Sequence, residues 1–250
     1  MRIRLLLLPA IVMCLVSVGS AADLGRNFEQ GNKHYADGAY KQAIDEYEQI
    51  LKAGYQSSAV FYNLGNAYFR DGQLGMAIMN YVRAQRLAPR DDDIKTNLEF
   101  ARQFAIDKIE VTEETIILEY INRIFDGFTI NEITWLAAIC YLLTIAIILV
   151  RYIYRVYRIP TPVFVVVVAA FALTVVLTGV KLDRDVLTRK GVVVAQQVEV
   201  KSGPGEDLSS KFTAHAGLIF NIDGEEEGYF RVNFENRLTG WIPKSATEEI

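Results

Sequence analysis

The chain has 250 residues, of which 51% are hydrophobic, and its mean hydropathy of +0.16 is too apolar for one ordinary soluble domain of this length. The formal net charge is −4, and the only segments with net positive charge are residues 1–22 and 133–180. Because neither is a basic block large enough to follow a phosphate backbone, we expect no nucleic-acid binding.

The first segment, residues 1–22, has the features of a secretory signal peptide. Arg2 and Arg4 give it a positive start, an apolar run follows over residues 5–18, and small residues occupy positions 19–22. This order is typical of a segment that directs export and is then cleaved. An uncleaved anchor is the alternative, and both interpretations place the next residues outside the cytoplasm.

The next segment, residues 23–106, contains a repeat with a period of 34 residues. The repeated residues are Gly31, Gly38, Ala43, Ile44 and Tyr47, which recur as Gly65, Gly72, Ala77, Ile78 and Tyr81. The spacing predicts two helical hairpins, in which small residues allow close helix packing and tyrosines fill the space between hairpins. The pattern resembles the tetratricopeptide repeat, which implies an all-α solenoid, although His34, Gln30 and Tyr55 depart from it in the first unit.

A repeat stack leaves its last apolar face uncovered, so we expect a capping helix within residues 91–106. Aspartates at 91–93 suit a helix N-terminus, and Ile94, Leu98 and Ala101 recur on one face. Residues 107–132 then form an amphipathic juxtamembrane segment. We expect it to lie on the bilayer surface or to pack against the repeats or a partner.

The inner face of such a stack carries a repeated set of polar and aromatic residues. Its members are Phe28, Asn32 and Tyr35 in the first unit, and Tyr62, Asn66, Phe69 and the adjacent Arg70 in the second. We expect the amides and the arginine to hold the backbone or a carboxylate of an extended peptide, with the aromatic rings covering its side chains. The alternative is that the aromatic residues pack against one another or against the capping helix.

Two uncharged stretches, residues 133–150 and 159–180, are long enough as helices to cross the ~30 Å hydrocarbon core of a bilayer. The loop between them, residues 151–158, carries three arginines and no acidic residue. Basic loops favour the cytoplasmic side. Basic residues also follow the second stretch closely, so the exported N-terminus decides: the chain enters through the first helix and leaves through the second. We therefore expect a two-pass protein of the bacterial inner membrane, with both soluble parts on the extracytoplasmic side.

The last segment, residues 181–250, changes to a period of two, which predicts short β-strands. Strands are expected at residues 192–195, 198–201, 229–234 and 240–243, and the set resembles a small all-β SH3-like barrel of the bacterial type. We expect Gly240 to permit a tight approach and Trp241 to be half-buried. Some domains of this type bind cell-wall peptides and others bind proteins; a structural or docking module is favoured here.

The sequence lacks the residue patterns of common active sites, and we expect a non-enzymatic protein without cofactor or metal. Its two histidines, His34 and His215, lie in different parts, with His34 at a packing position and His215 in a loop. The acidic runs at 91–93 and 225–227 are expected to be a helix cap and a hairpin tip. The two cysteines, Cys14 and Cys140, fall in apolar segments, so no disulfide is expected in the soluble parts.

The order of these segments predicts a multidomain membrane protein, and over nearly the whole chain it resembles the BatE-type proteins of the Bacteroides aerotolerance operons. The residues that carry this are the repeats, Asn97-Leu98-Glu99 in the cap, the membrane hairpin and Ser202-Gly203-Pro204. The resemblance implies a scaffold working with von Willebrand A-domain membrane proteins and, indirectly, a MoxR-type ATPase, in stress or oxygen tolerance. A protein that senses or tethers the cell wall by binding peptidoglycan is the alternative.

Overall fold

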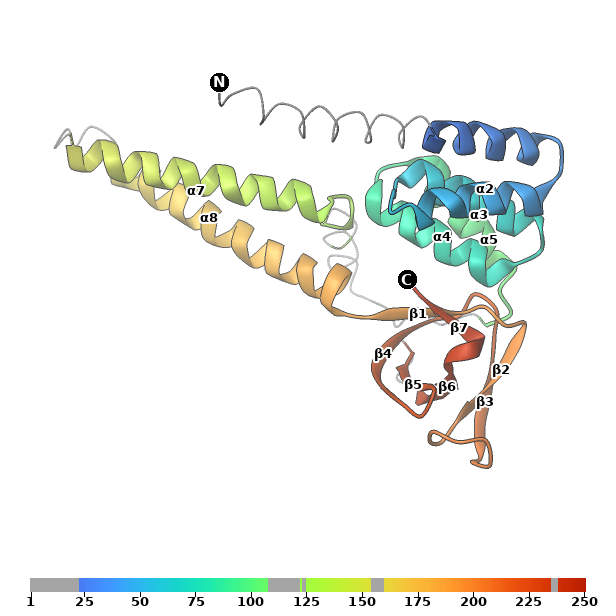
Figure 1. Cartoon of the computed structure of the whole chain (residues 1–250). Helices are drawn as coiled ribbons and strands as arrows, with labels where there is room; N and C mark the ends of the chain where they lie inside the picture. Colours follow the sequence, from blue (N-terminus) through green and yellow to red (C-terminus); the bar gives the residue numbers. More distant parts are fainter. Residues whose placement is uncertain (1–22, 108–121, 123–124, 154–159, 235–237) are drawn as a thin grey trace, which may run out of the picture.

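The computed structural model describes residues 23–107, 122, 125–153, 160–234 and 238–250. They form a helical part (residues 23–107), a pair of long apolar helices and a β part (residues 190–250), as Figure 1 shows. The predicted signal peptide, most of the amphipathic segment 107–132 and most of the loop 151–158 lie outside the described residues.

The helical part consists of consecutive helices joined by short turns. Residues 23–36 are helical, and they are followed by α2 (Tyr40–Lys52), α3 (Ser58–Arg70), α4 (Leu74–Leu87) and α5 (Asp92–Gln103). The side chain of Ser57 accepts a hydrogen bond from the amide of Val60 and so caps α3. Asp91 caps α5 in the same way, as the acidic run predicts.

The 34-residue repeat in the sequence is also a repeat of contacts. A Cβ atom added at Gly31 would lie 2.6 Å from the ring of Tyr47, and one added at Gly65 would lie 2.8 Å from the ring of Tyr81. These two glycines therefore allow the tyrosine of the following helix to pack directly on the backbone. In α5, Ile94, Leu98 and Ala101 are buried, which confirms the predicted apolar face of this helix.

The apolar pair consists of α7 (Ile130–Ile153) and α8 (Thr161–Leu182), and within the described chain these two helices are long and apolar enough to cross a membrane. Only 6% of the most apolar window of each is buried. Both helices extend beyond the uncharged stretches 133–150 and 159–180, α7 at each end and α8 at its C-terminal end. Thr129 and Glu132 exchange backbone and side-chain hydrogen bonds and cap the start of α7, and Pro160 is the N-cap residue of α8.

The β part is one seven-stranded antiparallel sheet with the strand order β3-β2-β6-β5-β4-β1-β7. Its strands are β1 (Lys190–Val193), β2 (Gln197–Lys201), β3 (Ser210–His215), β4 (Ile219–Glu226), β5 (Tyr229–Asn233), β6 (Thr239–Pro243) and β7 (Thr247–Glu249). Strands occur in all four predicted regions. A Cβ atom at Gly240 would lie 2.4 Å from Val200, which confirms the predicted tight approach, and Trp241 is half-buried.

The helical part and the β part share one hydrophobic core. Val192 of β1 is fully buried in the same cluster as Ile78 and Tyr81 of the helical part. The closest approach is between backbones: a Cβ atom at Gly75 in α4 would lie 2.3 Å from the carbonyl oxygen of Val193. A glycine is therefore needed where β1 crosses α4.

Polar contacts lie at the end of the apolar helix pair where α7 begins and α8 ends, the end nearest the helical and β parts (Figure 1). Arg90, just after α4, donates a hydrogen bond to the carbonyl oxygen of Gly127 at 3.2 Å and forms an ion pair with Glu132. At the end of α8, the ammonium group of Lys181 lies 3.2 Å from a carboxylate oxygen of Asp185. Arg90 therefore joins the helical part to the start of α7, whereas the Lys181–Asp185 pair lies at the end of α8 itself.

Replacing Gly75 with alanine tests the shared core. We expect Gly75→Ala to lower the free energy of unfolding by about 1–3 kcal/mol, because the new methyl group meets backbone atoms of β1 that have no room to move. Gly25→Ala is the matched control: it has no atom within 4 Å of the added Cβ and should raise stability by up to about 1 kcal/mol. Denaturant unfolding of the detergent-solubilised chain measures both, and equal effects would contradict the close contact.

Candidate functional site

Four asparagines form a hydrogen-bonded ladder along the helical part. The Nδ2 group of Asn63 donates to Oδ1 of Asn32 at 2.9 Å, and that of Asn97 donates to Oδ1 of Asn66 at 3.0 Å. Each acceptor also receives a tyrosine hydroxyl: Tyr47 donates to Asn32 at 2.8 Å and Tyr81 donates to Asn66 at 2.7 Å. We call Asn32, Asn63, Asn66 and Asn97 the asparagine ladder.

The sequence repeat explains why the two hydrogen-bonded asparagine pairs of the ladder are alike. Asn32 and Asn66 occupy one repeated position, Asn63 and Asn97 occupy another, and the two donating tyrosines occupy a third. Asn63 and Asn97 were not among the predicted site residues. Their separation equals the repeat period, which is the sequence signal by which they could have been found.

The tyrosines of the ladder are buried phenols that remain protonated at neutral pH. Burial raises the pKa of Tyr47 to about 12, and burial likewise raises the pKa of Tyr81 above its ordinary value of 10.0. Both hydroxyls therefore act as donors, and the Oδ1 atoms of Asn32 and Asn66 are used as acceptors within the fold. Among the described residues, the Nδ2 groups of these two asparagines make no hydrogen bond, so two donors are left for a ligand.

The predicted aromatic residues lie close to the ladder and pack against neighbouring rings. The rings of Phe28 and Tyr47 have centroids 6.0 Å apart, and those of Tyr62 and Tyr81 are 6.1 Å apart. The ring centroids of Tyr35 and Tyr40 are 5.5 Å apart. These distances are within the range of favourable aromatic pairs, so the rings help to hold the helices together as well as lining the face.

Phe69 packs against two aromatic rings. Its ring lies 5.6 Å from that of Phe100 and 5.4 Å from that of Phe104, both near the end of α5. Phe100 and Phe104 are themselves about half exposed. Phe69 thus contacts the capping helix, as the alternative interpretation of the aromatic set predicts for this residue.

Arg70 is exposed at the end of α3 and is oriented by an aromatic residue of the first repeat. Its Nε atom donates to the hydroxyl of Tyr40 at 3.1 Å, and its guanidinium carbon lies 5.5 Å from the centre of that ring. The hydrogen bond from Arg70 to Tyr40 raises the pKa of the guanidinium. Its remaining N–H groups are available to an acceptor beside the ladder.

The structure corrects the position of His215. It is the last residue of β3, opposite Gln197, rather than part of a loop, because the strand pairing continues to the first residue of β2. Its backbone amide donates to Asp107 at 2.6 Å, and its Nδ1 atom lies 3.0 Å from the same carboxylate. His215 therefore joins the β part to Asp107, which follows α5 in the chain.

Acidic clusters in the described ranges show the predicted structural roles. Asp91 accepts hydrogen bonds from the backbone at the start of α5. Glu225 forms ion pairs with Lys244 at 3.0 Å and Arg189 at 3.4 Å, and the Lys244 hydrogen bond is the main cause that lowers the pKa of its carboxyl group. No group of three or more His, Cys, Asp or Glu residues suited to a metal ion occurs among the residues that the structure describes.

The chain matches no protein-family model, and a search of curated proteins finds no match.

The structural role of the ladder is testable at Asn66. We expect Asn66→Ala to lower the free energy of unfolding by about 1–3 kcal/mol, because Tyr81 and Asn97 lose their shared acceptor. Asn66→Asp keeps an acceptor oxygen in that place, so it should retain most of the stability. Thermal and denaturant unfolding compare the two variants, and equal loss of stability in both would contradict this role for Oδ1.

Proposed function

We propose that this protein is a non-enzymatic membrane scaffold that holds an extended peptide segment of a partner protein along the asparagine ladder. The observation that carries the proposal is the pair of uncommitted Nδ2 donors at Asn32 and Asn66, one in each repeat. Hydrogen-bond donors at a regular spacing suit the carbonyl groups of an extended backbone. The orienting contacts within the fold keep these donors in place before a ligand arrives, which lowers the entropy lost on binding.

We also propose a fold family for the helical part and one for the β part. The glycine–tyrosine contacts that recur with the 34-residue period support a tetratricopeptide repeat. A small antiparallel sheet with a tight crossing at Gly240 supports an SH3-like barrel for the β part. Both modules are associated with protein binding in general rather than with catalysis, which fits a scaffold.

We further propose that the scaffold works in a Bat-type complex, with von Willebrand A-domain membrane proteins as direct partners and a MoxR-type ATPase as an indirect one. This rests on the resemblance of the whole chain. In-cell crosslinking and membrane co-purification test it: recovery of a defined set of membrane proteins supports the complex. Loss of the captured material after cell-wall digestion would instead favour the peptidoglycan-binding alternative for the β part.

Aspartate substitutions separate binding by the ladder from its structural role. We expect Asn32→Asp combined with Asn66→Asp to reduce crosslinked partner recovery by about tenfold or more, because each change removes a donor and adds a negative charge. Stability should change little, since each aspartate still accepts from its tyrosine. Asn27→Asp, in the first helix but outside the ladder, is the matched control. Undiminished recovery with the double variant would refute the peptide-binding role.

We propose that α7 and α8 form a two-pass anchor in the bacterial inner membrane, with both soluble parts on the extracytoplasmic side. The basic loop 151–158 and the export signal in the sequence support this orientation.

Cysteine labelling in intact spheroplasts tests the orientation. In a background with Cys14 and Cys140 replaced by serine, we expect Lys41→Cys and Asp207→Cys to react with a membrane-impermeant reagent, because both positions are exposed on soluble parts. Arg155→Cys should react only after the membrane is permeabilised. Protection at either soluble position, or labelling of the Arg155→Cys variant in intact cells, would contradict this topology.

A further inference from the structure

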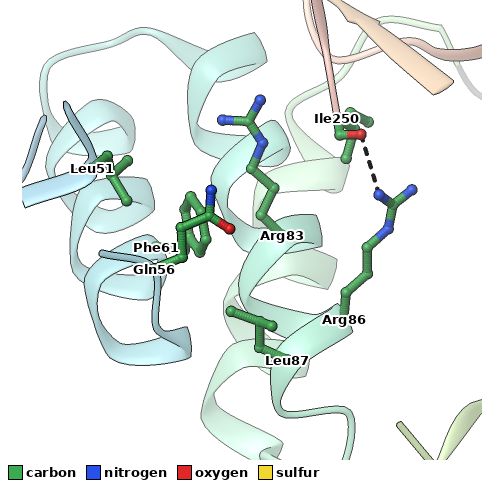
Figure 2. Close-up of a pocket in the computed structure, with 7 residues that line it drawn as sticks. All are labelled: Leu51, Gln56, Phe61, Arg83, Arg86, Leu87 and Ile250. Atoms are coloured by element: carbon green, nitrogen blue, oxygen red, sulfur yellow. Dashed lines mark hydrogen bonds between the residues drawn. The ribbon is translucent and has the colours of Figure 1, made fainter. Parts of the chain in front are cut away.

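The pocket drawn in Figure 2 lies where the helical and β parts meet, and a residue of the chain itself enters it. Ile250, which follows β7, lies beside Arg83 and Arg86, and Arg86 donates a hydrogen bond to its backbone oxygen at 3.2 Å. Arg83 donates to the backbone oxygen of Glu249. These contacts belong to the junction of the two parts.

An apolar pocket of about 400 Å³ lies between the first helix (residues 23–36), the end of α2 and the start of α3. None of its lining residues is charged. Ile50 and Val60, which are buried, form its base, and Tyr55, which is 52% exposed, lies at its edge. Ser57 also lines it, but its hydroxyl oxygen accepts a hydrogen bond from the amide of Val60. The pocket therefore suits an apolar group that enters from solvent, and its volume exceeds the ~150 Å³ that holds a benzene ring inside a protein.

This apolar pocket adjoins the Asn32–Asn63 pair of the asparagine ladder. Phe28 lines it from the first helix and Ala59 lines it from α3, and each comes four residues before one asparagine of this pair. Side chains four residues apart lie on the same face of a helix, so the pocket and the pair share one face, about 6 Å apart along the helices. The ring of Phe28 also packs against that of Tyr47, whose hydroxyl donates to Asn32 at 2.8 Å. Tyr47 thus positions both a wall of the pocket and the neighbouring asparagine.

The residues of the apolar pocket are not repeated in the second unit. At the positions 34 residues later, Asp91 and Asp93 replace Ser57 and Ala59. Tyr55, which departs from the repeat pattern in the sequence, borders the pocket with its exposed side chain. An apolar side chain therefore fits beside the first asparagine pair, whereas the equivalent positions near the second pair carry negative charge.

We propose that the apolar pocket binds a large apolar side chain of the extended peptide held by the asparagine ladder, and so selects which segment is bound. The proposal rests on the proposed peptide binding, because Asn32 supplies the donor beside the pocket. An extended chain advances about 3.3 Å per residue, so this side chain belongs to a residue within about two positions of the carbonyl group at Asn32. Its burial against Phe28, Ile50 and Val60 adds affinity that a small or charged side chain does not gain.

Fluorescence anisotropy with the full chain in lipid nanodiscs tests the proposal. The probe is a labelled threonine-rich heptapeptide with a central leucine, and the control peptides carry alanine or glutamate in its place. We expect the unmodified chain to bind the leucine peptide about tenfold more tightly than the alanine peptide, because the larger side chain removes more apolar surface from water. The glutamate peptide should bind less tightly still, since its charge loses water in an uncharged pocket.

Filling the pocket should remove this preference for leucine. Ala59→Leu adds an apolar side chain at an exposed position that lines the pocket, and this variant should bind the leucine and alanine peptides equally. Tyr55→Ser, at an exposed turn, should reduce the preference severalfold. Gln42→Leu is the matched control, because it adds a leucine at an exposed position of α2 that does not line the pocket, and it should keep the full preference.

The outcomes separate this proposal from peptide binding by the ladder. A preference for leucine that Ala59→Leu abolishes and Gln42→Leu retains supports the pocket, whereas a preference that Ala59→Leu leaves unchanged would overturn it. Equal binding of the leucine and alanine peptides, lost for both when Asn32→Asp is combined with Asn66→Asp, would contradict the pocket and leave the ladder standing. Failure of all three peptides to bind would contradict both. Equal binding together with dimerisation that Ala59→Leu abolishes would assign the pocket to a second copy of the chain and overturn the proposal.

Discussion

The crossing of β1 over α4 is the contact on which the arrangement of the soluble parts depends. At Gly75 the helix backbone lies against the carbonyl oxygen of Val193, and this closeness lets Val192 enter the helical core. Full burial of one such side chain contributes about 1.5–3 kcal/mol. The sheet therefore covers apolar residues that an isolated helical stack would expose, and the two parts need not be regarded as independently tethered modules.

Two sets of polar contacts differ in whether they depend on this crossing. The asparagine ladder is formed within the helical repeats and uses one set of side-chain oxygens to hold the helices together, which leaves Nδ2 donors of Asn32 and Asn66 for a ligand. The contacts of Arg83 and Arg86 depend on the crossing, because both guanidinium groups donate to backbone oxygens at the end of the β part.

The candidate site was only partly predictable from the sequence. The repeated positions of Asn32 and Asn66 are visible in the sequence because both follow the helix repeat. Their hydrogen-bonding partners Asn63 and Asn97 lie in α3 and α5, so the pairing depends on how these helices pack against the preceding ones. In Asn32 and Asn66 the side-chain oxygen is used within the fold and the nitrogen is not. This difference arises from how the helices pack, and the residue type alone does not specify it.

Local physical signals in the sequence determined the helix repeat, the two long apolar helices and the regions of four strands, because period, length and alternation act within each element. Local chemistry also acts at the helix starts. Thr129 and Glu132 form a capping pair before α7, and Pro160 is the N-cap residue of α8. Only the tertiary structure shows that the helical and β parts pack together. Gly75 and Val193 are far apart in the chain, and a single close backbone contact between them produces no periodic pattern that the sequence could display.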